Sequence, residues 1–527
     1  MRRRRSDLIA QALRLGSRVE RSPHRQMFGH QPCWSLLPLF GSLVLALPGW
    51  AQTGGLTVHP SASVTETWTD NYRLTSVNPA IDTVTRLSAG VSLRSPAGPL
   101  QGYLDYALSN LVYARHSENN EFQNSLNANF NARSTEGRAA IGVAASISRS
   151  AVSAFGVQPG GSGLTQANSA ELRTLALTPQ FQGPIGTAVH YTASLGYNTS
   201  SANGTSLGDA SNSSAMLHLA PSKPARLGWT LDGSRLRSEF KAGRPTVSDR
   251  LFAGLSLGLA ELDLQISANR GVELSDLTVS QRQRYQTLGF GAVWAPSSRT
   301  QLTAKIDQRP AGNTHTLSLE HRTPLTVWTL SDTRSLSSEA NPAATTGRGA
   351  AYDAFYAQFA SAIPDPVERA NFVVNFLRQQ GISSVVNPGF LSSAASLTHL
   401  QALSTAWRGQ RSTAMLSLTR STSRRVDSAS VAVDDLSAAG QVQLIGASLD
   451  LSQRLTPLSS MTLVLSGSQG RGTLASQFNR QRQASLQYSL RPTVQSSLIV
   501  GLRRVRYENA LSPFGESAIF ATVAIQF

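Results

Sequence analysis

The sequence predicts an all-β protein, a transmembrane antiparallel up-and-down β-barrel of about 22 strands, with about 18 to 22 fitting the pattern, and a small helical insert. Three observations predict this class. Segments of about ten residues alternate between polar and apolar side chains, the connections between them alternate between long and short, and the last segment ends in an aromatic residue.

The alternation is the signal for strands with one wet and one apolar face, because successive side chains of a strand point to opposite sides. It is cleanest in residues 125–133, 261–269, 301–307 and 483–491. A barrel in lipid places the apolar face outward and gathers aromatic residues near both interfaces. The candidates for these aromatic girdles are Trp229, Trp294, Trp407, Tyr285, Tyr488 and Tyr507.

The connections distinguish a membrane barrel from a soluble sandwich, which has no reason to place long and short loops on opposite sides. Counting back from the carboxyl end, long connections are expected at 509–516, 470–477, 424–439, 240–247 and 151–168. Short ones are expected between them, for example at 491–495, 456–459 and 408–411. Long outer loops and short periplasmic turns are typical of transmembrane barrels.

The last strand has Phe527, Ile525 and Val523 on one side. This pattern resembles the terminal signature of bacterial outer-membrane β-barrel proteins, in which the segment is the assembly signal and the last strand pairs with the first. An ordinary carboxyl-terminal strand of a soluble β-domain is the alternative.

Residues 1–51 are predicted to be a signal peptide and residues 52–527 a single outer-membrane barrel. The leader is rich in arginine, has an apolar stretch from Trp34 to Leu47, and ends in the small residue Ala51. The start codon is either Met1 or Met27. Export places the chain in the Gram-negative outer membrane, with outer-membrane lipid, lipopolysaccharide and the barrel assembly machinery as expected partners.

Composition narrows the remaining classes. Only 15% of the residues are charged and 40% are hydrophobic, which fits neither a helical membrane bundle nor a charged globular surface. The net charge of +16 comes mostly from arginine. An exported basic chain meets anionic polysaccharide or lipid phosphates, so we expect no nucleic-acid partner.

A segment at about 340–390 breaks the alternation and is predicted to be helical. Asp365 is a good N-cap, Pro366 fits the first helical position, and Glu368 completes a capping box beside Arg369. A shorter helix is expected at 351–360. The insert lies in a long outer loop, so it either caps the mouth of the barrel or plugs the lumen.

Arginines on or near the polar faces of strands are the candidate lumen residues, because guanidinium groups hold carboxylate or phosphate with two hydrogen bonds. They are Arg133, Arg149, Arg420, Arg491 and Arg503. They either favour anionic solutes or pair with carboxylates across the barrel and stiffen it.

No catalytic, cofactor-binding or metal-binding motif is found. Residues 254–258 spell the Gly-x-Ser-x-Gly string of a nucleophile elbow, but they lie in an alternating strand rather than a strand-to-helix turn. His315 and His321 share a strand face six residues apart, too far for a metal pair without further ligands. We therefore expect no enzyme and no cofactor.

Two further motifs resemble the outer-membrane β-barrel proteins associated with the PEP-CTERM and exosortase system. They are the opening strand at residues 64–71, which ends in Thr69-Asp70-Asn71, and the insert at 363–381. The resemblance covers essentially the whole mature chain. It implies a location beside exopolysaccharide synthesis and protein-sorting machinery.

The expected function is a conduit or docking component for an exopolysaccharide or another surface polymer, gated by the insert. The alternatives are a TonB-dependent-like or porin-type channel, a barrel hydrolase, and a purely structural surface barrel. A TonB-dependent receptor is disfavoured because no plug domain of about 130 residues separates Ala51 from the first strand.

Overall fold

A computed structural model describes residues 55–95, 98–158, 164, 166–223, 225–279, 281–338, 341, 350–359, 363, 369, 373, 389–426, 434–493, 495–509 and 513–527. The strands are β1 (Thr57–Thr69), β2 (Asp82–Ser95), β3 (Leu100–Tyr113), β4 (Glu121–Arg133), β5 (Ala139–Ala151), β6 (Ser169–Ile185), β7 (Val189–Ala202), β8 (Ala210–Pro221), β9 (Leu227–Phe240), β10 (Thr246–Leu259), β11 (Leu264–Ser275), β12 (Gln283–Ser297), β13 (Thr300–Asp307), β14 (Thr314–Arg322), β15 (Thr326–Ser337), β16 (Ser396–Arg408), β17 (Ser412–Arg425), β18 (Gln441–Thr456), β19 (Ser459–Arg471), β20 (Phe478–Leu490), β21 (Ser496–Asn509) and β22 (Phe514–Gln526). The helices are η1 (Ser117–Asn119), η2 (Ala260–Leu262), α2 (Ala350–Gln358) and α4 (Asp435–Ala439). The leader at 1–51 lies outside the described residues.

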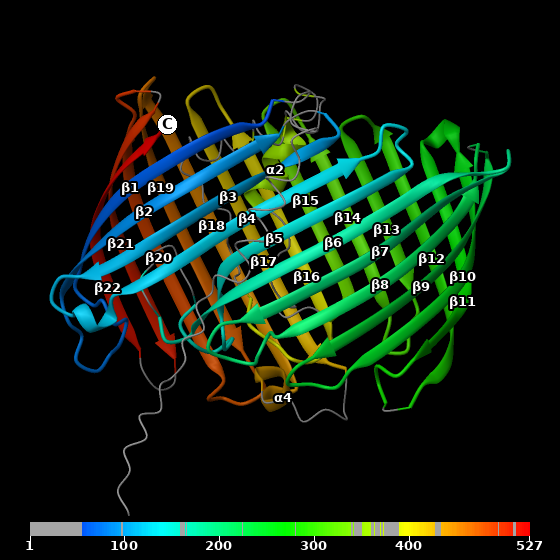
Figure 1. Cartoon of the computed structure of the whole chain (residues 1–527), viewed down its shortest axis with the longest axis horizontal. Helices are drawn as coiled ribbons and strands as arrows, with labels where there is room; N and C mark the ends of the chain where they lie inside the picture. The colour runs from blue at the N-terminus through cyan, green and yellow to red at the C-terminus, as the bar shows by residue number, and fades with distance from the viewer. Residues whose placement is uncertain are drawn as a thin grey trace, which may run out of the picture. The chain divides into compact units, whose positions relative to one another are not determined.

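Every strand pairs antiparallel with its neighbours in sequence, and β1 also pairs with β22, so the sheet closes on itself (Figure 1). Closure matters because hydrocarbon offers no partner for an exposed backbone N–H or C=O group. The predicted antiparallel barrel is confirmed, with 22 strands.

The connections also alternate as expected, with two differences. Turns after even-numbered strands are short, such as residues 323–325 and 409–411, whereas those after odd-numbered strands include 152–168 and 338–395. The ends of the barrel are called here the short-turn end and the long-loop end. The loops expected to be long at 240–247 and 509–516 shrink to 241–245 and 510–513, because their flanking strands extend further than the alternation indicated.

The outer face is apolar over most of its height. In β22, Ile519, Val523 and Ile525 alternate with less exposed residues and are 48%, 51% and 42% exposed. Such side chains would be costly in water and suit lipid. The closed ring and its apolar outer wall place the protein in the outer membrane. Among the described residues, no helix is long and apolar enough to cross a membrane.

Four of the six aromatic residues predicted for the girdles lie on the outer face at the short-turn end, and the other two do not lie on the outer face. Trp229, Trp294, Trp407 and Tyr488 are exposed on the outer face near the short turns. Tyr285 and Tyr507 instead share the inner parity of their strands, and Tyr507 is 1% exposed because a loop covers it from the lumen side. These two tyrosines were wrong predictions for the girdle.

The seam between β1 and β22 is reinforced on its inner side. Glu516 accepts hydrogen bonds from Thr69 Oγ1 at 3.0 Å and from Arg503 at 2.6 and 3.2 Å, so one carboxylate joins β1, β22 and β21. Both partners of the ion pair are nearly inaccessible. At the short-turn end, the Phe527 amide donates to the Pro60 carbonyl at 2.9 Å.

Replacing the buried carboxylate should weaken the seam. In Glu516→Gln the Arg503 charge stays buried without its counter-ion, which costs about 3 kcal/mol. Urea unfolding of the barrel in lipid vesicles measures the change. The control is Glu136→Gln, whose ion pair with Arg138 is largely exposed and should contribute within about 0.5 kcal/mol. Equal stability of the two variants would contradict a structural role for the inner seam network.

Candidate functional site

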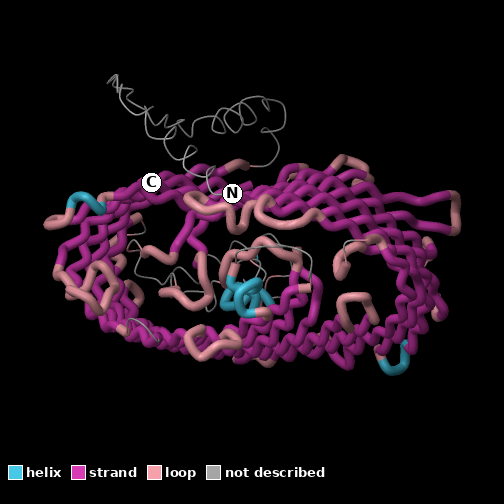
Figure 2. The backbone as a smooth tube through the Cα atoms, turned by 90° about the horizontal axis from the view of Figure 1, so that it is seen from below, coloured by secondary structure: helices cyan, strands magenta, loops and turns pink. Residues whose placement is uncertain are grey.

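Helix α2, the described helix of the insert, lies inside the barrel. Helix α2 is enclosed by the ring of strands in Figure 2 and contacts β15, β16 and β17. Its Phe355 and the following Phe359 are buried against Val327, Ala406 and Met415, which form one row across the three strands. Of the two arrangements left open by the sequence, the described part of the insert therefore adopts the plug.

The plug enters the lumen at the long-loop end and reaches the short-turn end. The loop 338–395 leaves β15 at the long-loop end, yet the Gln358 amide donates to the Leu325 carbonyl in a short turn, at 3.1 Å. Arg322 donates to the Ala357 carbonyl at 3.2 Å, and the Arg408 guanidinium lies 4.6 Å from the centre of the Phe359 ring. Among the described residues of the insert, Asn341 and Phe390 therefore lie at the long-loop end and α2 lies at the short-turn end.

Most of the predicted longer helix, including Asp365, Pro366 and Glu368, lies outside the described residues. Arg369 is described. Its guanidinium lies 4.1 Å from the centre of the Tyr356 ring, and it donates to the Ile363 carbonyl at 3.4 Å. Arg369 therefore holds the segment after α2 back onto the helix.

Other loops close the long-loop end from inside. The loop 152–168 extends from β5 to the wall at β20 and β21, where its Phe155 carbonyl accepts from the Tyr507 hydroxyl at 2.9 Å. The Ala154 carbonyl accepts from the Asn479 amide at 2.9 Å. The Leu391 amide, from the loop before β16, donates to Ala151 at the end of β5 at 3.0 Å. Figure 2 shows such loops within the ring.

Two adjacent aspartates at the start of α4 join three of these loops. Asp434 Oδ2 accepts from the Ser392 hydroxyl and the Ser393 amide, both at 2.9 Å. Asp435 Oδ2 accepts from the Ser153 hydroxyl at 2.9 Å and the Ala154 amide at 2.6 Å. We call Asp434 and Asp435 the mouth dyad, because their carboxylates tie the β17–β18 loop to the loops after β5 and β15.

Several described charges on the inner wall are matched by opposite charges. Arg94 pairs with Asp105 at 2.6 Å, and Arg309 grips Glu273 with two hydrogen bonds of 2.7 and 3.0 Å. Arg250 lies beside the same carboxylate at 3.6 Å. For these residues the pairing alternative raised from the sequence describes the wall better than a continuous anion path.

The five predicted lumen arginines are not brought together. Arg503 is buried in the seam network, and Arg149 forms an ion pair with Glu121 at the long-loop end. Arg133 points inward by strand parity near a short turn and donates to the Asn131 side chain at 3.0 Å. Arg491 lines a shallow pocket at the short-turn end with Arg454.

Arg420 is the exception, because it does not line the lumen. It pairs in register with Ile445, which is 41% exposed on the outer face, and directly paired residues share a face. Its guanidinium contacts the Gln443 side chain, also on that face. The polar position was mistaken for an inner one because β17 continues above the apolar belt, where outer side chains are polar too.

Inner arginines do gather at the short-turn end, along the wall that carries the plug. By strand parity and contacts, Arg322 of β14, Arg408 of β16 and Arg454 of β18 point inward there, and Arg491 follows β20. We call these four residues the basic rim. Within this rim, Arg322 pairs with Glu320 at 3.2 Å.

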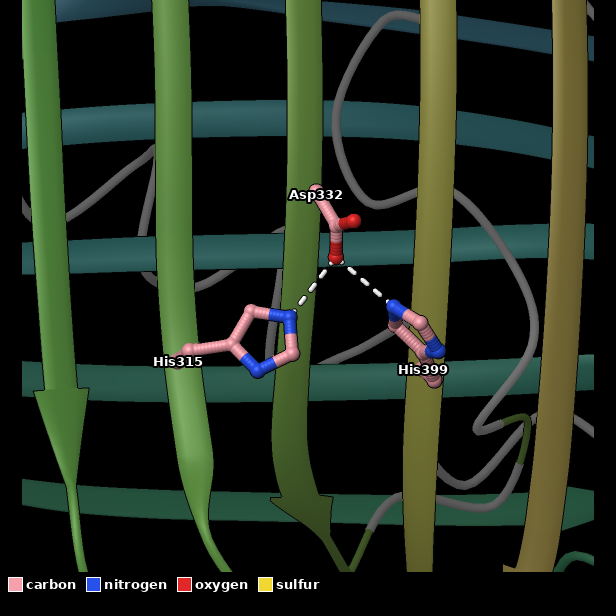
Figure 3. A group of neighbouring side chains, drawn as sticks. All are labelled: His315, Asp332 and His399. Carbon is pink, nitrogen blue, oxygen red and sulfur yellow. Dashed lines mark hydrogen bonds and ion pairs between the residues drawn. The ribbon is translucent and has the colours of Figure 1, made fainter.

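A potential metal-binding group lies on the outer wall. His315 Nε2 and His399 Nε2 each lie 2.7 Å from Asp332 Oδ1, and Gln401 donates to the other carboxylate oxygen at 3.0 Å (Figure 3). Two imidazoles and a carboxylate suit Zn²⁺ or Cu²⁺. Asp332 is paired with the exposed Leu317, so the group faces away from the lumen and is no part of a transport path.

The sequence showed His315 but not its partners. His399 and Asp332 stand on β16 and β15, separated from each other by the insert, and only the strand register brings them together. The signal in the sequence would have been three polar residues at similar heights on neighbouring strands, at positions that alternate with the inward residues and are otherwise apolar.

No protein-family model matches the chain, and no curated protein matches it. Solved structures with a similar backbone include the FrpB iron transporter from Neisseria meningitidis, with 11% identity and a TM-score of 0.44 over 89% of this chain and 81% of that one. The ferric enterobactin receptor PfeA of Pseudomonas aeruginosa gives 10% and 0.43 over 90% and 81%. OccK2 (OpdF) of the same species, in complex with glucuronate, gives 10% and 0.34 over 90% and 98%. At this level of identity the likeness concerns the barrel fold alone.

The mouth dyad should respond to pH. Burial raises the pKa of Asp435 above its ordinary value of 3.8, against the hydrogen bonds from Ala154 and Ser153, and the charge of Asp434 raises it further. The docked state therefore binds the proton more tightly than the undocked one. Docking of the loop is weakest above the raised pKa and strengthens as the pH falls through it toward 3.8.

Hydrogen exchange of the Ala154 amide, corrected for its intrinsic rate, measures this docking. Protection in the native protein should rise as the pH is lowered from 7.5 through the raised pKa of Asp435 toward 3.8. In Asp435→Asn, which keeps an acceptor oxygen but carries no charge, protection should not depend on pH, and at pH 7.5 it should equal or exceed that of the native protein. Protection that falls on acidification of the native protein would contradict the assignment.

Proposed function

We propose that this outer-membrane barrel is a gated, non-enzymatic conduit or docking component for export of an anionic surface polymer. The observation that carries the proposal is the plug docked inside the lumen beside the basic rim. A closed ring of 22 strands encloses a space wide enough to need an obstruction, and the insert and the inward loops supply it.

The arrangement of charge supports an anionic passenger entering from the periplasm. Towards the long-loop end, Arg309, Arg250 and Arg503 have carboxylate partners, so those charges are largely neutralised. The basic rim concentrates cations at the short-turn end, where a polymer leaving the periplasm arrives. Guanidinium groups bind uronate carboxylates and phosphates with two hydrogen bonds.

The gate has a mechanical basis in the same contacts. Arg322 and Arg408 belong both to the basic rim and to the plug interface. An anion that binds these guanidinium groups competes with their contacts to Ala357 and Phe359. Passenger binding and plug release then favour each other, because both depend on the same two side chains. The resemblance to barrels of the PEP-CTERM and exosortase system supports an exopolysaccharide as the passenger.

Removing the plug should open the channel. The Phe390 amide donates to Asn341 Oδ1 at 3.0 Å, so the ends of the insert are neighbours and residues 342–388 can be replaced by a short Gly-Ser linker. Single-channel recording in planar bilayers should show that the plug-excised barrel has a conductance several-fold above that of the native chain. Phe355→Leu, which keeps an apolar side chain in the plug interface, is the control. Unchanged conductance after excision in a folded barrel would rule out the plug as the gate.

The basic rim should set ion selectivity. In the plug-excised barrel, Arg408→Gln with Arg454→Gln should lower the anion-to-cation permeability ratio about several-fold, because two fixed positive charges leave the entrance. Arg420→Gln removes the same charge from the outer wall and should leave the ratio unchanged. Equal effects of inner and outer substitutions would refute the rim. Passage of small ions but not of acidic oligosaccharides would favour a porin-type channel.

A further inference from the structure

The outer wall at β19, β20 and β21 changes character sharply along its height. Its lower rows are Leu463, Leu486 and Leu502, which are directly paired and face lipid. Towards the long-loop end, the outward positions of these strands include five arginines, beginning with Arg504, which follows Leu502 on the outer face of β21. We call them the outer arginine patch, which consists of Arg471, Arg480, Arg482, Arg504 and Arg506.

The strand register places like charges of this patch directly opposite each other. Arg482 and Arg506 are directly paired across β20 and β21, an arrangement that is destabilising without an intervening anion. Their other neighbours in the same row are Gly467 of β19 and Gly515 of β22, so neither flanking residue of that row has a side chain to place over the guanidinium groups. Arg504, one row below, contacts the Ser517 hydroxyl.

Carboxylates neutralise little of the patch. Glu508 lies 3.2 Å from Arg506 and 4.0 Å from Arg480, and within the described ranges it is the acidic residue in ion-pair contact with these arginines. Five cations therefore share one carboxylate. The guanidinium of Arg506 belongs to a side chain that is 72% exposed, so it is accessible to a ligand.

The strand pair β9 and β10 carries a similar outward pair of arginines, one of which faces a carboxylate on the neighbouring strand. Arg235 and Arg237 of β9 occupy the same positions along their strand as Arg504 and Arg506 do along β21, and they face outward. Across from Arg235 stands Asp249 of β10, 3.6 Å away, and Arg237 pairs with Glu239. Arg506 likewise pairs with Glu508 on its own strand, so the difference lies across the strands. The residues opposite Arg504 and Arg506 on β20 are Ala484 and Arg482, so neither arginine faces a carboxylate as Arg235 faces Asp249.

We propose that the outer arginine patch is a binding site for the phosphate groups of a phosphorylated glycolipid of the outer leaflet. The patch begins directly above the leucine rows that contact acyl chains, which is where the headgroups of those lipids lie. Arg482 and Arg506 hold a phosphate between them, and Arg480, Arg504 and Arg471 flank it. Bidentate hydrogen bonds to phosphate replace the repulsion between the opposed guanidinium groups with shared attraction.

Native mass spectrometry of the full-length barrel in detergent tests the site with diphosphoryl lipid A as the probe. The native protein should retain the lipid, and Arg482→Gln with Arg506→Gln should weaken binding about tenfold or more. The matched control, Arg235→Gln with Arg237→Gln, should bind like the native protein. Heat-modifiable mobility on gels confirms that each variant is folded.

Three further measurements distinguish a lipid phosphate from free phosphate as the ligand. Lipid A stripped of its phosphates should bind as weakly to the native protein as diphosphoryl lipid A binds to the double variant. Inorganic phosphate at millimolar concentration should not displace the lipid. Arg482→Lys with Arg506→Lys keeps the charge but loses the bidentate geometry, and it should bind with intermediate affinity.

Three results would overturn the proposal. They are equal lipid A binding by the native protein and the Gln double variant, equal loss in the β9 control, and displacement by inorganic phosphate, which would indicate a site for free anions. The Arg482→Gln, Arg506→Gln variant should also gain stability when the glycolipid is absent. In vesicles of phosphatidylcholine, where no phosphomonoester is present to bridge the arginines, it should unfold at a higher urea concentration than the native barrel, because the opposed charges are gone.

Discussion

The backbone hydrogen bonding of the strand ring is the constraint on which the rest of this protein depends. Lipid cannot satisfy an open strand edge, so the sheet has to close through β1 and β22. Closure leaves two wall surfaces with opposite demands, an outer one that must be apolar through the membrane and an inner one free to be polar. The buried Glu516, which joins three strands at the seam, can exist because the inner surface is polar and shielded.

The inner surface uses its polarity unevenly. Towards the long-loop end, Arg309 and Arg503 are held by carboxylates, and inward loops are fixed by Asp434 and Asp435. At the short-turn end, Arg322 and Arg408 instead contact the plug, while Arg94 is paired with Asp105. In the conduit proposed above, this division places the gate on the periplasmic side.

The alternation of side chains was sufficient to predict the barrel, its strand number and the plug-bearing loop, because lipid imposes one residue pattern on every strand. It could not predict the face of residues beyond the lipid belt. There, both faces are polar, and Arg420 looks the same as a lumen residue. Nor could it predict Tyr507, which an inward loop covers, or the group of His315, Asp332 and His399, which depends on register between strands that are distant in sequence.

The plug has a consequence for biogenesis. Its segment connects β15 to β16, seven strands before the ring is completed, and it ends up deep within the finished cylinder. Threading it through a sealed mouth, past the loops that cross there, would require those loops to undock. The simpler order is for the segment to fold onto the inner faces of β15, β16 and β17 while the sheet is still an open arc, so that the last strand encloses it. The plug would then act during assembly as a template around which the curved sheet wraps.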